Sequence, residues 1–178
     1  THNDTNDYDY KVSGSNVVFE MNDGNDWEIF VYDESLGGDP VQLTDNEDNG
    51  NSTPVDDRFA NLYRVGDELF ITWARFDGND YEIMLTHGDP TNISELQANI
   101  VQLTDNNFHD KSPELSEDLI VWWGEATPGN SDIFIYDIGD GVVENISNSP
   151  YPDFDPQVSG SNVVWFSDLG FGNEVYVS

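Results

Sequence analysis

The chain has 178 residues, no cysteine, and 36 acidic against 5 basic side chains, which gives a formal net charge of −31 at pH 7. This charge repels nucleic acid phosphates and anionic lipid head groups, and excludes both as partners, while the lack of cysteine excludes disulfides, zinc–thiolate sites and cysteine nucleophiles. With 37% hydrophobic and 13% aromatic residues, a chain of this length can bury the core of one domain.

The predicted elements recur along the chain as copies of one unit. Four residues mark equivalent positions, spaced 43, 60 and 43 residues apart: Thr1, Thr44, Thr104 and Ser147. They divide a single domain, 1–178, into units of about 1–44, 45–104, 105–147 and 148–178. The second unit carries 17 extra residues, partly near 46–57 and partly near 89–98, where a short helix is predicted over Asn92–Ala98. Such a countable period indicates a repeat architecture.

Each unit is predicted to form four antiparallel strands. In the first copy the expected strands are Tyr8–Val12, Asn16–Glu20, Trp27–Tyr32 and Pro40–Leu43. These runs are rich in β-branched and aromatic residues. Gly, Asn and Asp separate them, as in 23–26 and 77–80, and tolerate the positive φ of tight hairpins.

Units of this size and strand number are typical of propeller blades. One such sheet cannot bury both of its faces alone, but radially stacked sheets cover one another. Aromatic residues are expected at equivalent second-strand positions, where they pack between blades: Phe19, Trp73, Trp123 and Trp165. The sequence therefore predicts an all-β propeller of four blades with four antiparallel strands each. No stretch is long and apolar enough to cross a membrane.

Two motifs carry a resemblance to a known family. An Asp-x-x-Pro-like element runs from Asp7 to Tyr10, from Asp110 to Pro113 and from Asp153 to Pro156, and a Gly-Asn-x-Glu/Asp-Ile-Tyr-like hairpin occurs in all four copies. The chain thereby resembles the TolB-type β-propeller repeat over nearly its whole length. The second copy departs from the repeat, because Ala60 sits where the Asp is expected.

The resemblance implies a propeller fold but no single function. The family includes periplasmic protein-binding propellers, extracellular domains of surface proteins, lids on serine peptidases and polysaccharide lyases. Fold alone does not select among them.

The fourth copy is expected to lack its outer strand, since Ser178 aligns with Tyr32 of the first copy. An open sheet edge is a template for strand addition, through which copies of the chain would join. Two alternatives would explain the missing strand: the given sequence ends before it, or the chain is a fragment of a propeller with more blades.

The strongest chemical signal is the set of carboxylate-rich turns. Calcium prefers such hard oxygen ligands, and the candidates on the hairpins are Asp23, Asn25, Asp26, Asp77, Asn79 and Asp80. The same residues are what a tight turn requires, so both interpretations stay open.

A second set of candidates, Asp7, Asp110 and Asp153, begins innermost strands and is expected near one mouth of the central channel. A cation there would relieve their mutual repulsion, or each Asp would cap its own loop.

We expect an extracellular or periplasmic, non-catalytic module that binds a protein or glycan partner and that calcium stabilises. The insertion in the second unit is the expected recognition loop, because long loops on rigid scaffolds carry binding. One alternative is a repeating structural subunit of a surface assembly joined by strand addition. Another is a polysaccharide lyase or glycoside hydrolase, although 36 carboxylates make some acid pair inevitable and therefore uninformative. The acidic surface also fits high salt or plain solubility.

Overall fold

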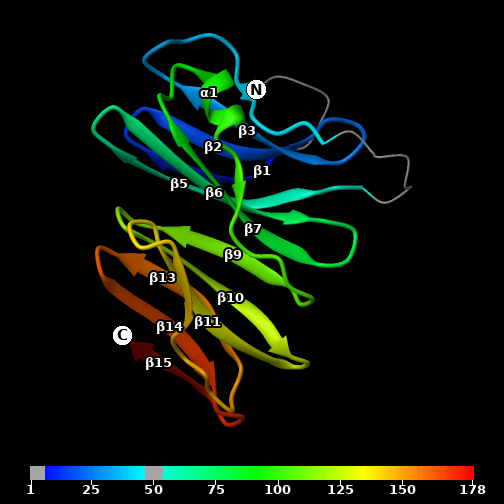
Figure 1. Cartoon of the computed structure of the whole chain (residues 1–178), viewed down its shortest axis with the longest axis vertical. Helices are drawn as coiled ribbons and strands as arrows, with labels where there is room; N and C mark the ends of the chain where they lie inside the picture. Colours follow the sequence, from blue (N-terminus) through cyan, green and yellow to red (C-terminus); the bar gives the residue numbers. More distant parts are fainter. Residues whose placement is uncertain (1–6, 47–53) are drawn as a thin grey trace.

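The computed structural model describes residues 7–46 and 54–178 and shows an all-β protein. Four antiparallel sheets are stacked one upon the next, each formed by consecutive segments of the chain (Figure 1). The expected architecture of four propeller blades is confirmed. We call the sheets blades 1 to 4 in chain order.

Each blade is a meander in which neighbouring strands in the chain are neighbours in the sheet. Blade 1 contains β1 (Asp7–Ser13), β2 (Asn16–Asn22), β3 (Trp27–Asp33) and β4 (Val41–Gln42). Blade 2 contains β5 (Asp57–Val65), β6 (Glu68–Phe76), β7 (Tyr81–Gly88) and β8 (Val101–Gln102), with helix α1 (Ile93–Ala98) before its last strand. Blade 3 contains β9 (Asp110–Leu115), β10 (Leu119–Thr127), β11 (Asn130–Asp137) and β12 (Val142–Asn145). Blade 4 contains β13 (Asp153–Ser159), β14 (Asn162–Asp168) and β15 (Asn173–Val177).

The first strand of every blade bends at its third residue. Each of these residues has a positive φ, between 40° and 60°: Asp9, Phe59, Ser112 and Asp155. The pairing register between the first and second strands shifts at the same place in all four blades. A bulge of this kind costs backbone strain in a non-glycine residue and re-aims the following side chains. Its repetition shows that the four units share one local geometry.

The core lies between the blades. One apolar cluster joins blades 1 and 2 around Trp73, a second joins blades 2 and 3 around Trp122, and a third joins blades 3 and 4 around Trp165. Trp73 and Trp122 are fully buried, and Trp165 is 7% exposed. Each indole lies on the face of its blade that meets the preceding blade, so the tryptophans hold the stack together.

The third copy of this aromatic position is Trp122, so the expectation that Trp123 is the equivalent residue is wrong. Trp122 lies two residues before Gly124, which pairs with Asp110, just as Trp73 lies two residues before Arg75, which pairs with Asp57. A shift of one residue along a strand moves a side chain to the opposite face. Trp123 is accordingly half-buried and packs against the cluster shared with blade 4.

The second blade does have the expected aspartate, which corrects the prediction that Ala60 replaces it. Asp57 begins β5 as Asp110 begins β9, and Ala60 follows the positive-φ residue where blades 3 and 4 have Pro113 and Pro156. The loop before Asp57 is longer than its counterpart before Asp110, and this length displaced the alignment.

Blade 4 has three strands, as expected, and β15 forms its edge. Every side chain of β15 is exposed, including Val175 and Val177 at 62% and 67%. In the part of the chain that the structure describes, no helix has the length and apolar character needed to cross a membrane.

Candidate functional site

In blades 1 to 3 the hydroxyl residue of the Leu-Thr motif binds the third strand, and the residue two positions later contacts the same strand; we call this arrangement the latch. Thr44 Oγ1 accepts a hydrogen bond of 2.9 Å from the Ile29 amide and donates to Glu28. Thr104 accepts from the Ile83 amide at 2.8 Å, and Ser147 accepts from the Ile133 amide at 2.9 Å. A hydroxyl is needed here because it both accepts and donates.

The residue two positions after this hydroxyl links blade 1 to blade 2 and blade 2 to blade 3. The Asn46 amide nitrogen donates to Glu28, and its side chain donates to Asp57 of blade 2 at 2.5 Å. The Asn106 side chain reaches Asp110 of blade 3 in the same way, at 2.7 Å. Each aspartate then accepts a hydrogen bond from the indole of its own blade.

These indole bonds account for the aspartates at the starts of the first strands. Trp73 Nε1 donates to Asp57 at 2.8 Å, and Trp122 Nε1 donates to Asp110 at 2.9 Å. Asp57 also forms a bidentate ion pair with Arg75. Asp57 and Asp110 are thus structural bridges between a loop of one blade and the core of the next.

Asp153 occupies the same position in blade 4 but has no such partners. It is 1% exposed, and neither carboxylate oxygen has a hydrogen-bond partner. Ser149 stands where the earlier blades have Asn46 and Asn106, and its amide donates to Asp132 at 3.0 Å as theirs do to glutamate. Its side chain is too short to carry the second half of the latch.

The predicted grouping of Asp7, Asp110 and Asp153 around one ion is not found among the described side chains. Neither Asp110 nor Asp153 belongs to a group of three acidic residues close enough to share an ion. The side chain of Asp7 lies outside the described part of the chain. Burial raises the pKa of Asp110 to about 7.

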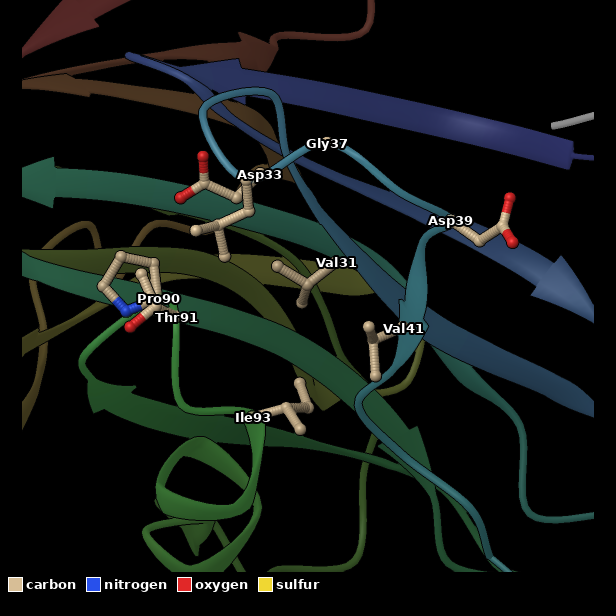
Figure 2. Close-up of a pocket in the computed structure, with 9 residues that line it drawn as sticks. Val31, Asp33, Gly37, Asp39, Val41, Pro90, Thr91 and Ile93 are labelled. Carbon is tan, nitrogen blue, oxygen red and sulfur yellow. The ribbon is translucent and has the colours of Figure 1, made fainter.

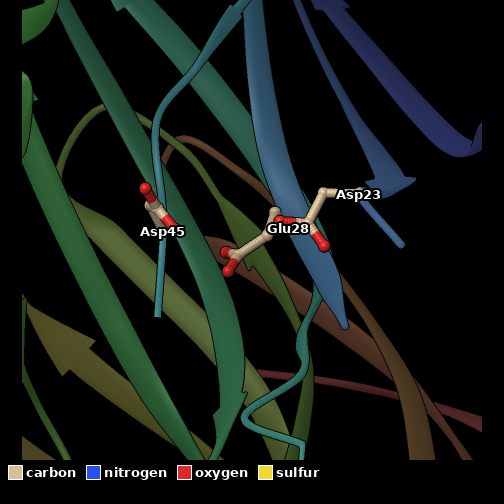
Figure 3. A group of neighbouring side chains, drawn as sticks. All are labelled: Asp23, Glu28 and Asp45. Atoms are coloured by element: carbon tan, nitrogen blue, oxygen red, sulfur yellow. The ribbon is translucent and has the colours of Figure 1, made fainter. Parts of the chain in front are cut away.

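Acidic residues do come together near two hairpins, and these groups contain three of the predicted calcium candidates, Asp23, Asp77 and Asp80, but not Asp26. In blade 2, oxygen atoms of Asp77, Asp80 and Glu82 lie within 4.8 Å of one another. In blade 1 the corresponding group is Asp23, Glu28 and Asp45, with the buried Glu28 between two exposed aspartates (Figure 3).

The same residues also build the turns, so the two interpretations of these motifs are compatible. Asp77 Oδ1 accepts from the amides of Asn79 and Asp80 at 2.8 and 3.1 Å, and Gly78 has a φ of 103°. The Asn79 side chain donates to Asp80 at 3.0 Å.

In blade 1, Asp23 accepts from the amides of Asn25 and Asp26 at 2.9 and 3.3 Å. The Asn25 side chain donates to Asp26 at 3.4 Å. Both asparagines orient an aspartate, a role distinct from the ligand role predicted for them.

Sequence reasoning missed Glu28, Glu82 and Asp45. Each glutamate lies two residues after the last aspartate of its hairpin, and residues at i and i+2 of a strand share one face. That spacing was the available signal. Burial raises the pKa of Glu28 to about 8 and also raises the pKa of Glu82 above its ordinary value.

A separate pocket of about 110 Å³ lies between blade 1 and the insertion of blade 2 (Figure 2). The β3–β4 segment of blade 1 and the residues leading into α1 form its walls, and its lining is Val31, Asp33, Leu36, Gly37, Asp39, Val41, Pro90, Thr91 and Ile93. Asp33 is held in place by Ser35 and by Asn16 at 3.1 Å. Leu36 is 61% exposed at the pocket, and Asp39 is exposed.

Comparison with known proteins supports the fold and reaches no further. No family model and no curated protein matches the chain. Among solved structures, TolB from Acinetobacter baumannii aligns with 98% of this chain and 41% of its own, at 12% identity and a TM-score of 0.64. TolB from Agrobacterium tumefaciens aligns with 86% of this chain and 50% of its own, at 18% identity and a TM-score of 0.59.

Propeller domains of peptidases are similar to the same degree. The β-propeller domain of the Trilobed protease from Pyrococcus furiosus, described as having an open velcro topology, aligns with 95% of this chain and 48% of its own, at 10% identity and a TM-score of 0.61. The chain spans about half the length of these proteins or less. At such identities the likeness concerns the fold, which is a TolB-like β-propeller.

Proposed function

We propose that the chain is a non-catalytic interaction module of the cell exterior or periplasm that binds a protein partner at the pocket beside α1. One observation carries the proposal: the insertion of blade 2 and the β3–β4 segment of blade 1 together form a hollow on a rigid stack of sheets. Binding sites are commonly long loops positioned by such a scaffold. The resemblance to the TolB-type repeat supports the compartment.

The lining of the pocket favours a peptide segment over a sugar. Val31, Val41 and Ile93 offer aliphatic contacts, and Leu36 stands exposed beside them. Among the described residues that line this pocket none is aromatic, and aromatic faces are among the groups that stack against ring-shaped ligands. The partner we propose therefore presents an aliphatic side chain to the pocket.

Charge indicates the second property of the partner. Asp39 is exposed at the pocket, and the chain as a whole carries a formal charge of −31. Such a surface accelerates the approach of a positively charged segment and repels a negatively charged one. A Lys or Arg beside the aliphatic side chain completes the proposed recognition motif.

Selection from a random peptide display library tests this proposal. We expect enriched peptides to combine an aliphatic residue with a neighbouring Lys or Arg, and to lose affinity for the variants Leu36→Ser and Asp39→Asn. Val142→Thr, a change of an exposed valine on blade 3, serves as the matched control and should bind normally.

Equal binding of the selected peptides to all variants would contradict the proposed site. Binding to a glycan array that Leu36→Ser abolishes would replace the protein partner by a glycan. Release of reducing sugar from any polysaccharide would contradict the non-catalytic assignment.

A further inference from the structure

The hairpin that joins β6 and β7 concentrates negative charge in a way that the turn itself does not require. Asp77 is exposed at the turn, whereas Asp80 and Glu82 are 3% and 1% exposed. Oxygen atoms of all three lie within 4.8 Å of one another. Bringing three carboxylates this close is unfavourable unless a positive charge lies among them.

Two of these buried oxygens, Asp80 Oδ1 and Glu82 Oε2, form no hydrogen bond of normal geometry, although the Thr104 hydroxyl lies near enough to Glu82 to lower its pKa. The other oxygen of each residue is engaged, since Asn79 donates to Asp80 Oδ2 at 3.0 Å and the Asn106 amide donates to Glu82 Oε1 at 2.8 Å. An unpaired buried carboxylate oxygen is costly, and such groups in native proteins are satisfied by a donor or by a metal.

Within the described part of the chain, no Lys or Arg side chain pairs with this group, and the charge of His109, which lowers the pKa of Asp80, is outweighed by burial. Among the described residues, the ion pairs made by Lys and Arg involve Glu20, Asp33, Asp57 and Glu114, none of which belongs to this hairpin. Burial raises the pKa of Asp80 and of Glu82, and the neighbouring charge of Asp77 raises both further.

The third blade shows what the same strand looks like without this cluster. Asp132 occupies the position of Glu82, and both of its oxygens have partners: Asn145 at 2.9 Å, and Ser147 and Ser149 at 3.4 and 3.0 Å. The latch alone can therefore satisfy an acidic residue at this position. The unpaired oxygens of blade 2 therefore do not follow from the latch, and in blade 1 the equivalent hairpin residue Asp26 also has one unpaired buried oxygen, Oδ1.

We propose that Asp77, Asp80 and Glu82 bind one calcium ion at the β6–β7 hairpin. Three carboxylates give one ligand each, and water completes the six to eight oxygens that calcium takes. Calcium fits better than magnesium because it accepts irregular geometry, whereas magnesium demands a near-ideal octahedron. Only oxygen donors are present in the group, which disfavours zinc and copper. The site is independent of the peptide pocket.

Isothermal titration with calcium chloride in 150 mM sodium chloride, combined with thermal unfolding in calcium or EDTA, tests the site. We expect the double variant Asp80→Asn/Glu82→Gln to bind one calcium ion fewer per chain than the unmodified protein. Its melting temperature in EDTA should be higher than that of the unmodified protein, because a buried repulsion is removed, and its response to calcium should be smaller.

Asp132→Asn is the matched control, because it neutralises the equivalent acid in blade 3. It should bind as many calcium ions as the unmodified protein. Unchanged calcium stoichiometry in the double variant would overturn the proposal. So would the absence of calcium binding to the unmodified protein at millimolar concentration.

Discussion

Replacing Ser149 by Asn should repair the incomplete latch between blades 3 and 4. In the two preceding latches an asparagine side chain donates to the buried aspartate of the next blade, at 2.5 Å to Asp57 and 2.7 Å to Asp110. Ser149 is anchored by the same backbone contact, an amide hydrogen bond of 3.0 Å to Asp132. An asparagine there is therefore placed to reach Asp153.

The magnitude follows from the state of Asp153, which is 1% exposed with both oxygens unpaired. A hydrogen bond to a buried charged group contributes about 1.5 to 3 kcal/mol to the free energy of unfolding. For a domain of this size, each kcal/mol raises the melting temperature by about 2 to 4 °C. Ser149→Asn should thus raise the melting temperature by about 3 to 12 °C in calorimetry.

The reciprocal change provides the control. Asn106→Ser should remove the bond to Asp110 and lower the free energy of unfolding by about 1 to 3 kcal/mol, because a buried oxygen loses its partner. If Ser149→Asn left the melting temperature unchanged or lowered it, while Asn106→Ser was destabilising, the equivalence of the latches would be refuted.

Two further predictions concern the core and the buried acids. Trp122→Phe should lower the free energy of unfolding in urea by about 2 to 4 kcal/mol, because it removes buried surface and the indole hydrogen bond to Asp110. Trp123→Phe should lower it by less than half as much. Equal losses for the two variants would contradict the strand register described above. Glu28 has a pKa raised by burial from 4.5 to about 8, so its protonated form stabilises the fold fully below about pH 4.5, and this stabilisation is lost as the pH rises through about 8. At 1.36 kcal/mol per pKa unit this loss of stability is at most roughly 5 kcal/mol, and urea unfolding in EDTA at a series of pH values measures it. Glu28→Gln should flatten the dependence of the unfolding free energy on pH. If the substitution left that dependence unchanged, other groups would control it.

The repeat made the fold predictable from the sequence. Because each blade uses the same meander, the strands and turns of one copy constrain those of the others, and the helix over Asn92–Ala98 stood out as the exception. Helix α1 (Ile93–Ala98) confirms it, with Asn92 as its N-cap.

Two residues, Trp123 and Ala60, were assigned to the wrong repeat positions, because the local sequence pattern allowed more than one alignment of the copies. Two adjacent tryptophans, Trp122 and Trp123, fit the same aromatic position, and only the pairing of Gly124 with Asp110 decides between them. The longer loop before Asp57 moved the aspartate out of the expected frame. In both cases a tertiary contact, the hydrogen bond from indole to aspartate, fixes the true register.

The candidate sites were predictable only in part. The hairpin aspartates were expected as calcium ligands, but the glutamates beyond them acquire their importance from burial, which the hairpin motif does not reveal. The pocket required knowledge that the β3–β4 segment of blade 1 lies beside Pro90, Thr91 and Ile93 of blade 2. No local pattern contains that information.

Hydrogen exchange with and without a selected aliphatic-basic peptide tests whether the pocket beside α1 binds a partner. We expect slower exchange at the amides of residues 33–41 and 89–98, which surround the pocket. Slower exchange confined to the acidic hairpins at 23–26 and 77–80, or no change at saturating peptide, would contradict a binding site beside α1.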